Sequence, residues 1–145
     1  MMAEAKEPAS ITSRPITYTH KIPVAKTQTF WEKLKEGKIC ATKCKKCGSL
    51  YYPPQADCPQ CLTSEIEWLE LDEEAILETY THVHARPQGF TQYEPYIIAV
   101  AKTSEGVKVM GWLEDVKPAE VKVGMKLKMA TRTLPDGYIT IVFKP

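Results

Sequence analysis

The sequence lacks long apolar runs and has no marked excess of charge of either sign. None of its apolar stretches approaches the roughly 20 residues that a membrane span needs, and its N-terminus lacks the apolar segment of a secretory signal. The formal net charge is +1, without the strongly basic balance typical of proteins that bind phosphate backbones. We therefore expect a cytoplasmic protein and do not expect membrane attachment.

Catalytic signatures are also absent. The chain contains no nucleophile elbow and no glycine-rich phosphate loop, and its carboxylates are scattered over presumed outer faces. His82 and His84 alternate along a predicted strand, but no third metal ligand accompanies them, so we interpret them as exposed or hydrogen-bonded side chains. His20 receives no role. The sequence therefore favours a protein that is not an enzyme.

Two C-x-x-C motifs are the strongest chemical signal in the chain. Gly48 follows the first motif and can adopt the positive φ that turns backbone amides toward sulfur, while Pro59 stiffens the second. Four thiols brought together by one short hairpin suit a tetrahedral metal ion better than a disulfide framework. The predicted ligands of this single structural zinc ion are Cys44, Cys47, Cys58 and Cys61. Iron is an alternative, because rubredoxin binds iron with similar knuckles, but zinc is favoured.

Cys40 is the fifth thiol, and we interpret it as a small buried hydrophobe. A short amphipathic helix is predicted before it. Thr29 and Glu32 have the spacing of a capping box, a start one turn earlier at Thr27 is the alternative, and Gly37 is placed to end the helix in a left-handed turn. The predicted apolar stripe consists of Phe30, Trp31 and Leu34. These aromatics either pack on the neighbouring module or face a partner.

The rest of the chain reads as strands separated by turns. A zinc ribbon is predicted first, followed by five strands with a longer gap between the third and the fourth, which is typical of an OB-type Greek-key barrel. An open sandwich is the alternative. The strands of the ribbon are predicted at residues 38–43, 50–54 and 66–71, and those of the barrel at 75–83, 96–102, 107–113, 125–130 and 138–143.

These elements predict a mainly β protein in four parts. They are a loose or extended N-terminal arm at 1–25, an amphipathic helix at 26–38, a rubredoxin-like zinc ribbon at 39–70 and a five-stranded OB-fold barrel at 71–145. The loop after the first barrel strand lies where OB barrels commonly bind ligands. Its Phe90 and Tyr93, with Tyr96 and Trp112, form either an aromatic platform or part of the barrel core.

From Phe30 onward the chain resembles the zinc-ribbon/OB-fold family of acyl-CoA-associated proteins, long known as a domain of unknown function. The resemblance rests on motifs along the whole chain. They are Phe30-Trp31, Cys44-Lys45-Lys46-Cys47-Gly48, Pro53-Pro54, Cys58-Pro59-Gln60-Cys61, Pro95-Tyr96, Glu105-Gly106-Val107, Val123-Gly124-Met125 and the final Val142-Phe143-Lys144-Pro145. One position departs from the pattern, because Gln55 follows the proline pair where members often have arginine.

The resemblance implies an accessory protein. Similar archaeal members bind acetyl-CoA acetyltransferase, a thiolase, and hydroxymethylglutaryl-CoA synthase, so that acetoacetyl-CoA passes between them in the mevalonate pathway. Phe30 and Trp31 would then contact partners, and lysines near the first knuckle would face CoA phosphates. The candidate residues for contact with partners or CoA are Phe30, Trp31, Lys43, Lys45 and Lys46, together with Phe90 and Tyr93 of the loop after the first barrel strand.

Two other functions are compatible with the sequence. A protein that binds single-stranded nucleic acid is the main alternative, because zinc ribbons and OB barrels both serve that purpose and aromatic side chains can stack on bases. An independent enzyme that binds or hydrolyses acyl-CoA is the third possibility, although no general base has a recognisable partner.

Overall fold

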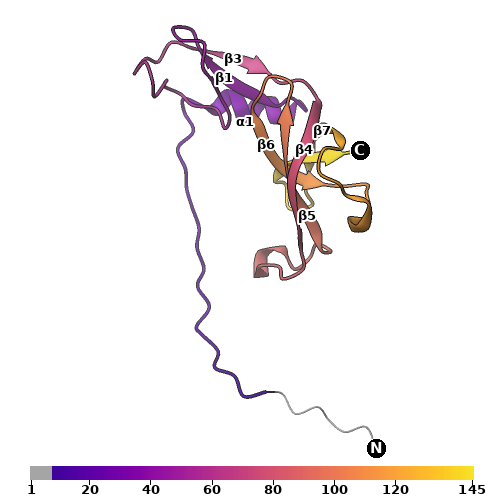
Figure 1. The fold of residues 1–145 in the computed structure, drawn as a ribbon. Helices are drawn as coiled ribbons and strands as arrows, with labels where there is room; N and C mark the ends of the chain where they lie inside the picture. The colour runs from indigo at the N-terminus through magenta and orange to yellow at the C-terminus, as the bar shows by residue number, and fades with distance from the viewer. Residues whose placement is uncertain (1–7) are drawn as a thin grey trace, which may run out of the picture.

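The protein is described here by a computed structural model that covers residues 8–145 (Figure 1). The predicted mainly β fold is confirmed. Its elements are α1 (Gln28–Lys35), β1 (Cys40–Cys44), β2 (Leu50–Tyr51), β3 (Ile66–Glu70), β4 (Glu74–Val83), β5 (Tyr96–Thr103), β6 (Lys108–Leu113), β7 (Lys126–Thr133) and β8 (Ile139–Lys144), with 3-10 turns η1 (Gln88–Phe90) and η2 (Pro118–Glu120). Over the described range, no helix is long and apolar enough to cross a membrane.

The N-terminal segment is extended and leaves the rest of the molecule. Residues 8–23 are all exposed and have no regular secondary structure, and Figure 1 shows them running away from the ribbon and past the barrel. The segment is fixed only at its base, where Lys26 lies 3.4 Å from Asp57 and Thr27 donates a backbone hydrogen bond to Val24. Residues 1–7 of the predicted loose arm lie outside the described residues.

Helix α1 ends as predicted and has the earlier of the two predicted starts, with Thr27 as its N-cap. Gly37 has a φ of +83°, and the amides of Gly37 and Lys38 donate to the carbonyls of Leu34 and Lys33, which is the Schellman pattern. The predicted Thr29–Glu32 capping box is wrong. The N-cap is Thr27 and has no side-chain cap hydrogen bond, because the chain enters the helix through the preceding turn.

The three-residue apolar stripe of this helix also needs correction. Phe30 and Leu34 are buried, whereas Trp31 is 48% exposed. Adjacent helical residues point about 100° apart, so Trp31 lies at the border of the buried face.

The ribbon is a small antiparallel sheet in the order β2-β1-β3. The strands after it form a closed barrel in the order β4-β5-β6-β8-β7, and all pairings are antiparallel except that of β6 with β8. The predicted OB-type barrel is therefore confirmed, and the open sandwich is not. Strand β7 runs to Thr133 instead of ending at 130, because Thr131 to Thr133 pair with β8 although their side chains no longer alternate in polarity.

One close approach inside the barrel requires glycine. A Cβ atom at Gly111 would lie 2.6 Å from the carbonyl oxygen of Ile141 and 3.0 Å from the ring of Phe143. Phe143 is completely buried, so a side chain at position 111 would force β6 and β8 apart.

Ribbon, helix and barrel share one hydrophobic core. Phe30 and Leu34 of α1 and Ala41 of β1 belong to the same buried cluster as Leu127 and Phe143 of the barrel. Where ribbon passes into barrel, Leu71 donates a backbone hydrogen bond of 2.8 Å to Ile39. The continuous core holds the ribbon and helix rigidly against the barrel.

Candidate metal centre

The first knuckle follows directly from strand β1. Cys44 is the last residue of the strand, and its carbonyl accepts a 2.9 Å hydrogen bond from the amide of Gly48. Gly48 has a φ of +75°, as the sequence predicts. The amides of Lys46 and Cys47 point at the sulfur of Cys44, at 3.4 and 3.5 Å. The backbone thus directs two amide donors at the sulfur of Cys44.

The second knuckle repeats this geometry with different residues. The amide of Cys61 donates to the sulfur of Cys58 at 3.4 Å, and Leu62 donates to the carbonyl of Cys58 at 2.9 Å. Leu62 occupies the position that corresponds to Gly48 and also has a positive φ, +52°. No residue type in the sequence predicts this positive φ, because leucine rarely adopts that conformation.

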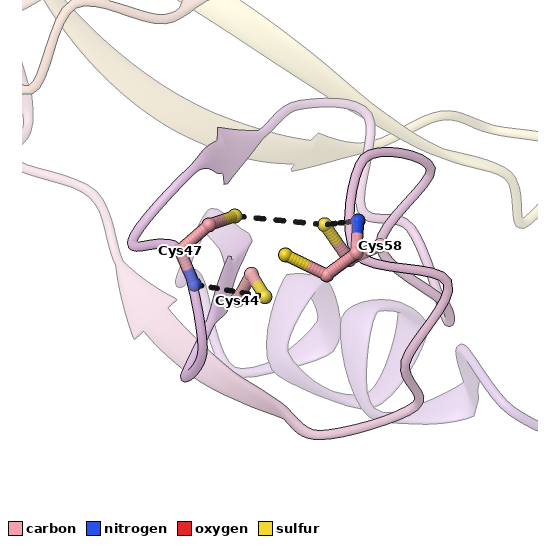
Figure 2. A group of neighbouring side chains, drawn as sticks. Cys44, Cys47 and Cys58 are labelled. Atoms are coloured by element: carbon pink, nitrogen blue, oxygen red, sulfur yellow. Dashed lines mark hydrogen bonds between the residues drawn. The ribbon is translucent and has the colours of Figure 1, made fainter.

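The four sulfur atoms lie within 4.8 Å of one another. The sulfurs of Cys47 and Cys58 are 3.7 Å apart, and Figure 2 shows the side chains of Cys44, Cys47 and Cys58 converging from the two knuckles. A zinc–sulfur bond of about 2.3 Å places the corners of a tetrahedron about 3.8 Å apart. The predicted ligands are thus brought together in an arrangement that fits a tetrahedral metal ion.

Two hydroxyl groups lie beside the sulfurs. The Tyr51 hydroxyl, 3.2 Å from the Cys58 sulfur, lowers the pKa of Cys58 to about 6. Ser49 lies 3.2 Å from the Cys47 sulfur and also lowers the pKa of that thiol. Ser49 in turn donates to Gln60, which joins the two knuckles. Sequence reasoning missed these groups, because their role depends on how the hairpin folds.

The fourth thiol shows why a cation suits the site. The pKa of Cys61 is raised to about 12, first by its contact with the Cys47 sulfur and then by burial. Neighbouring thiolates oppose the ionisation of one another, so protein groups alone do not stabilise four negative sulfurs. A divalent cation supplies the missing positive charge and lets all four act as ligands.

Cys40 does not take part in this site. It is 3% exposed, and burial raises the pKa of its thiol. This agrees with its interpretation as a small buried hydrophobe. Among the described residues, the cluster of four cysteines is the one group of potential metal ligands, and it includes neither His82 nor His84. These two imidazole rings instead lie against each other, with centroids 4.0 Å apart.

The other sequence-predicted residues lie on two separate surfaces. Phe30 is buried, while Trp31 and the three lysines Lys43, Lys45 and Lys46 are exposed around helix and ribbon. Phe90 and Tyr93 lie on the β4–β5 loop, at the end of the barrel that faces away from the ribbon (Figure 1). The structure does not combine them into one site.

An apolar groove of about 410 Å³ lies next to Trp31. Its walls come from four separate parts of the chain, so sequence reasoning could not assemble it. The base of the arm contributes Ile22, helix α1 contributes Phe30, the segment after β2 contributes Pro53, and the barrel contributes Met110 and Ile139. Met110 and Ile22 are 65% and 70% exposed, so the apolar surface extends beyond the groove.

The aromatic residues of the barrel end pack on one another. Tyr96 and Trp112 are stacked, with centroids 4.6 Å apart and planes 11° apart, and Tyr93 meets Trp112 edge to face at 5.2 Å. Arg132 lies 5.8 Å from the Trp112 ring and forms a 2.6 Å ion pair with Glu114. The rings thus use much of their surface within the protein, as a small satellite core does.

Comparisons with known proteins agree with this geometry. Residues 31–67 match the rubredoxin-like zinc ribbon domain of ChsH2, and residues 68–132 match its C-terminal OB-fold domain. The chain is 34% identical over 121 residues to a DUF35 domain-containing scaffold protein of Methanocaldococcus jannaschii, covering 79% of this chain and 85% of that protein. The chain belongs to the DUF35 family.

Further DUF35 relatives extend the comparison. A DUF35 domain-containing scaffold protein of Pyrococcus furiosus is 33% identical over 120 residues, covering 79% of this chain and 88% of that protein. The solved structure of an Ltp2-ChsH2(DUF35) aldolase superposes with a TM-score of 0.75 at 22% identity, over 91% of this chain and 98% of that one. A DUF35 protein of unknown function from Sulfolobus solfataricus gives 0.59 at 27% identity, over 83% and 84%.

Proposed function

We propose that this DUF35 protein is a non-catalytic scaffold. It would bind acetyl-CoA acetyltransferase, a thiolase, and hydroxymethylglutaryl-CoA synthase, and so help acetoacetyl-CoA pass between them in the mevalonate pathway. Two close relatives are named scaffold proteins. A more distant relative, 26% identical over 110 residues and matching 35% of its length, is the alpha subunit of a 3-oxo-4,17-pregnadiene-20-carboxyl-CoA hydratase from Mycobacterium tuberculosis. Association with enzymes of acyl-CoA metabolism therefore supports the proposal.

The observation that carries the proposal is the groove beside Trp31. A half-exposed tryptophan above an apolar groove is the type of side chain that contributes most to protein interfaces. The shared core contains Phe30 and Leu34 of α1, so it fixes the helix that carries Trp31 relative to both ribbon and barrel. A rigid surface loses little entropy on association, which favours binding.

The ribbon would supply this rigidity through its metal. We propose one structural zinc ion held by Cys44, Cys47, Cys58 and Cys61, with iron as the alternative that a red, oxidisable protein would reveal. Four thiolate ligands fill a tetrahedral shell and leave no position for a substrate. The proposal also requires a reducing compartment such as the cytoplasm, because oxidised thiols cannot act as ligands.

Direct contact with CoA would come from the lysines of the first knuckle. Lys43, Lys45 and Lys46 are exposed, and none of them takes part in the ion pairs formed among residues 8–145. They are available as point charges for phosphate groups. Phe90 and Tyr93 would contact a partner at the other end of the barrel. In this proposal the chain has four functional parts: the arm at 1–25, the helix at 26–38, the ribbon at 39–70 and the barrel at 71–145.

The proposal is tested by measuring binding to the thiolase and the synthase from the same organism, using purified proteins and light scattering coupled to gel filtration. We expect complexes with both enzymes. Trp31→Ala should raise the dissociation constant of at least one of these complexes at least tenfold. Val123→Ala serves as the matched control, because Val123 is 65% exposed and does not line the groove. Failure of the unaltered protein to bind either enzyme would refute the scaffold function.

The nucleic-acid alternative has weaker structural support. Bases stack on free aromatic faces, whereas Tyr96 covers one face of Trp112 and Arg132 lies over the same ring system. A salt-sensitive increase in the fluorescence anisotropy of a labelled single-stranded oligonucleotide, without any enzyme complex, would favour this alternative.

A further inference from the structure

A seven-residue part of the N-terminal arm has the pattern of a β-strand without a partner. This segment is residues 16–22, and its apolar and polar side chains alternate. One face would carry Ile16, Tyr18, His20 and Ile22, and the other would carry Thr17, Thr19 and Lys21. Side chains at alternate positions of a strand share one face. Tyr18 and His20 agree with this, because their rings contact each other at a centroid distance of 4.3 Å.

The apolar face of this segment is almost fully open to solvent. The exposed fractions of Ile16, Tyr18 and Ile22 are 92%, 78% and 70%. Among residues 8–145, no hydrogen bond joins residues 8–23 to the rest of the chain. Pro15 and Pro23 border the segment, and proline ends a strand because it has no amide hydrogen. An extended segment with an apolar face and free backbone groups is suited to strand addition.

The ribbon offers a free edge of similar length. In the sheet β2-β1-β3, strand β3 pairs with β1 only. Leu71 donates to Ile39, and Lys45 donates to Glu65, so odd-numbered residues of this strand direct their backbone groups toward β1. The even-numbered residues point outward. Within the described part of the chain, the amides and carbonyls of Trp68 and Glu70 have no backbone partner.

The two segments also carry opposite charge. Residues 8–27 contain three basic side chains, Arg14, Lys21 and Lys26, and no carboxylate. Residues 65–74 contain six carboxylates and no basic side chain, namely Glu65, Glu67, Glu70, Asp72, Glu73 and Glu74. Attraction between such surfaces favours their association and weakens with salt.

We propose that residues 16–22 of one copy add as a strand to the free edge of β3 in a second copy. The arm runs away from its own ribbon (Figure 1), so the pairing is between molecules. Because each copy has both the arm and the edge, the exchange is reciprocal and gives a closed dimer with two-fold symmetry. This inference concerns self-association and does not rest on the enzymes named above.

The full-length protein tests this by light scattering over a range of concentrations. We expect the mass to approach twice 16.4 kDa, with stronger association at low salt. The double variant Ile16→Asp/Tyr18→Asp should weaken dimerisation at least tenfold, because it places charge on the apolar face. The matched control Thr17→Asp/Thr19→Asp makes the same change in charge on the opposite face and should weaken it less than threefold.

Replacement of Tyr18 by the photoreactive p-benzoylphenylalanine locates the contact. Mass spectrometry of the irradiated full-length protein should find cross-links between chains to residues 64–72. Several results would overturn the inference: a monomer at every concentration, a dimer that survives Ile16→Asp/Tyr18→Asp, equal loss in the control, or cross-links confined to one chain or to the barrel.

Discussion

The two knuckles end in residues of different type, but both residues adopt a left-handed backbone conformation. Gly48 and Leu62 both have a positive φ, which glycine adopts freely and leucine only at a cost of roughly 1–2 kcal/mol. The residue type therefore revealed the first turn, whereas the second is imposed by its surroundings. The isolated bridge between Cys58 and Thr63 holds Leu62 at the tip of the turn, where it is 88% exposed.

The proposed zinc ligands are tested by Cys58→Ser, with Cys40→Ala as control. A serine hydroxyl is a poorer zinc ligand than a thiolate, so Cys58→Ser should lower bound zinc from one equivalent to less than half. The ribbon should unfold and the strand signal in circular dichroism should largely remain in the absence of urea, although the barrel should unfold at a lower urea concentration because it shares its core with the ribbon. Cys40→Ala removes a buried thiol outside the cluster and should keep the full zinc content, as measured by elemental analysis. Full zinc retention in Cys58→Ser would show that the ligand set is wrong.

At the scale of elements, local sequence signals predict most strand boundaries, whereas boundaries set by tertiary contacts cannot be predicted from the sequence. Most strands were predictable to within one or two residues because apolar alternation and turn residues mark them, as with the Asp136-Gly137 turn before β8. The last residues of β7 were not predictable, since Thr131 to Thr133 are held by pairing with β8. The groove beside Trp31 was equally hidden, because residues as distant as Ile22 and Ile139 form it.

The two ends of α1 give a direct test of which local signal matters. Gly37→Ala should lower the free energy of unfolding by about 1 kcal/mol, because alanine is strained at a φ of +83°. Thr29→Ala should change it by less than about 0.5 kcal/mol, because Thr29 caps nothing. Both are measured by urea denaturation at a fixed free zinc concentration. A larger loss for Thr29→Ala than for Gly37→Ala would contradict the observed helix boundaries.

At the scale of the whole molecule, the chain behaves as one body because its parts share a core. The sequence predicted a ribbon and a barrel as separate units, and the contacts between them were not predictable from either pattern. Ile39 and Leu71 belong to the segments that enter and leave the ribbon, yet both are buried in the cluster that fills the barrel. We therefore expect loss of ribbon packing to weaken the barrel.

Tyr52 allows this coupling to be measured through pH. Its ring packs against the shared core and lies 6.2 Å from that of Phe30, and burial raises the pKa of Tyr52 to about 12. The unfolded chain has a tyrosine pKa of about 10. A raised pKa in the folded state means that folding favours the protonated phenol. Its contribution is fully present below pH 10 and is lost as the pH rises from about 10 to 12.

The corresponding prediction compares the protein with Tyr52→Phe. Between pH 9 and about 11.5, the unaltered protein should lose up to about 2 kcal/mol more unfolding free energy than the variant, because phenylalanine cannot ionise. Tyr138→Phe is the control, since Tyr138 is 73% exposed. Unfolding in urea should be followed by circular dichroism for the barrel and, for the ribbon, by the fluorescence of Trp68 of β3 in a background where Trp31 and Trp112 are phenylalanine. If the shared core couples the two parts, both signals shift together; a shift in the ribbon signal alone would show that ribbon and barrel unfold independently.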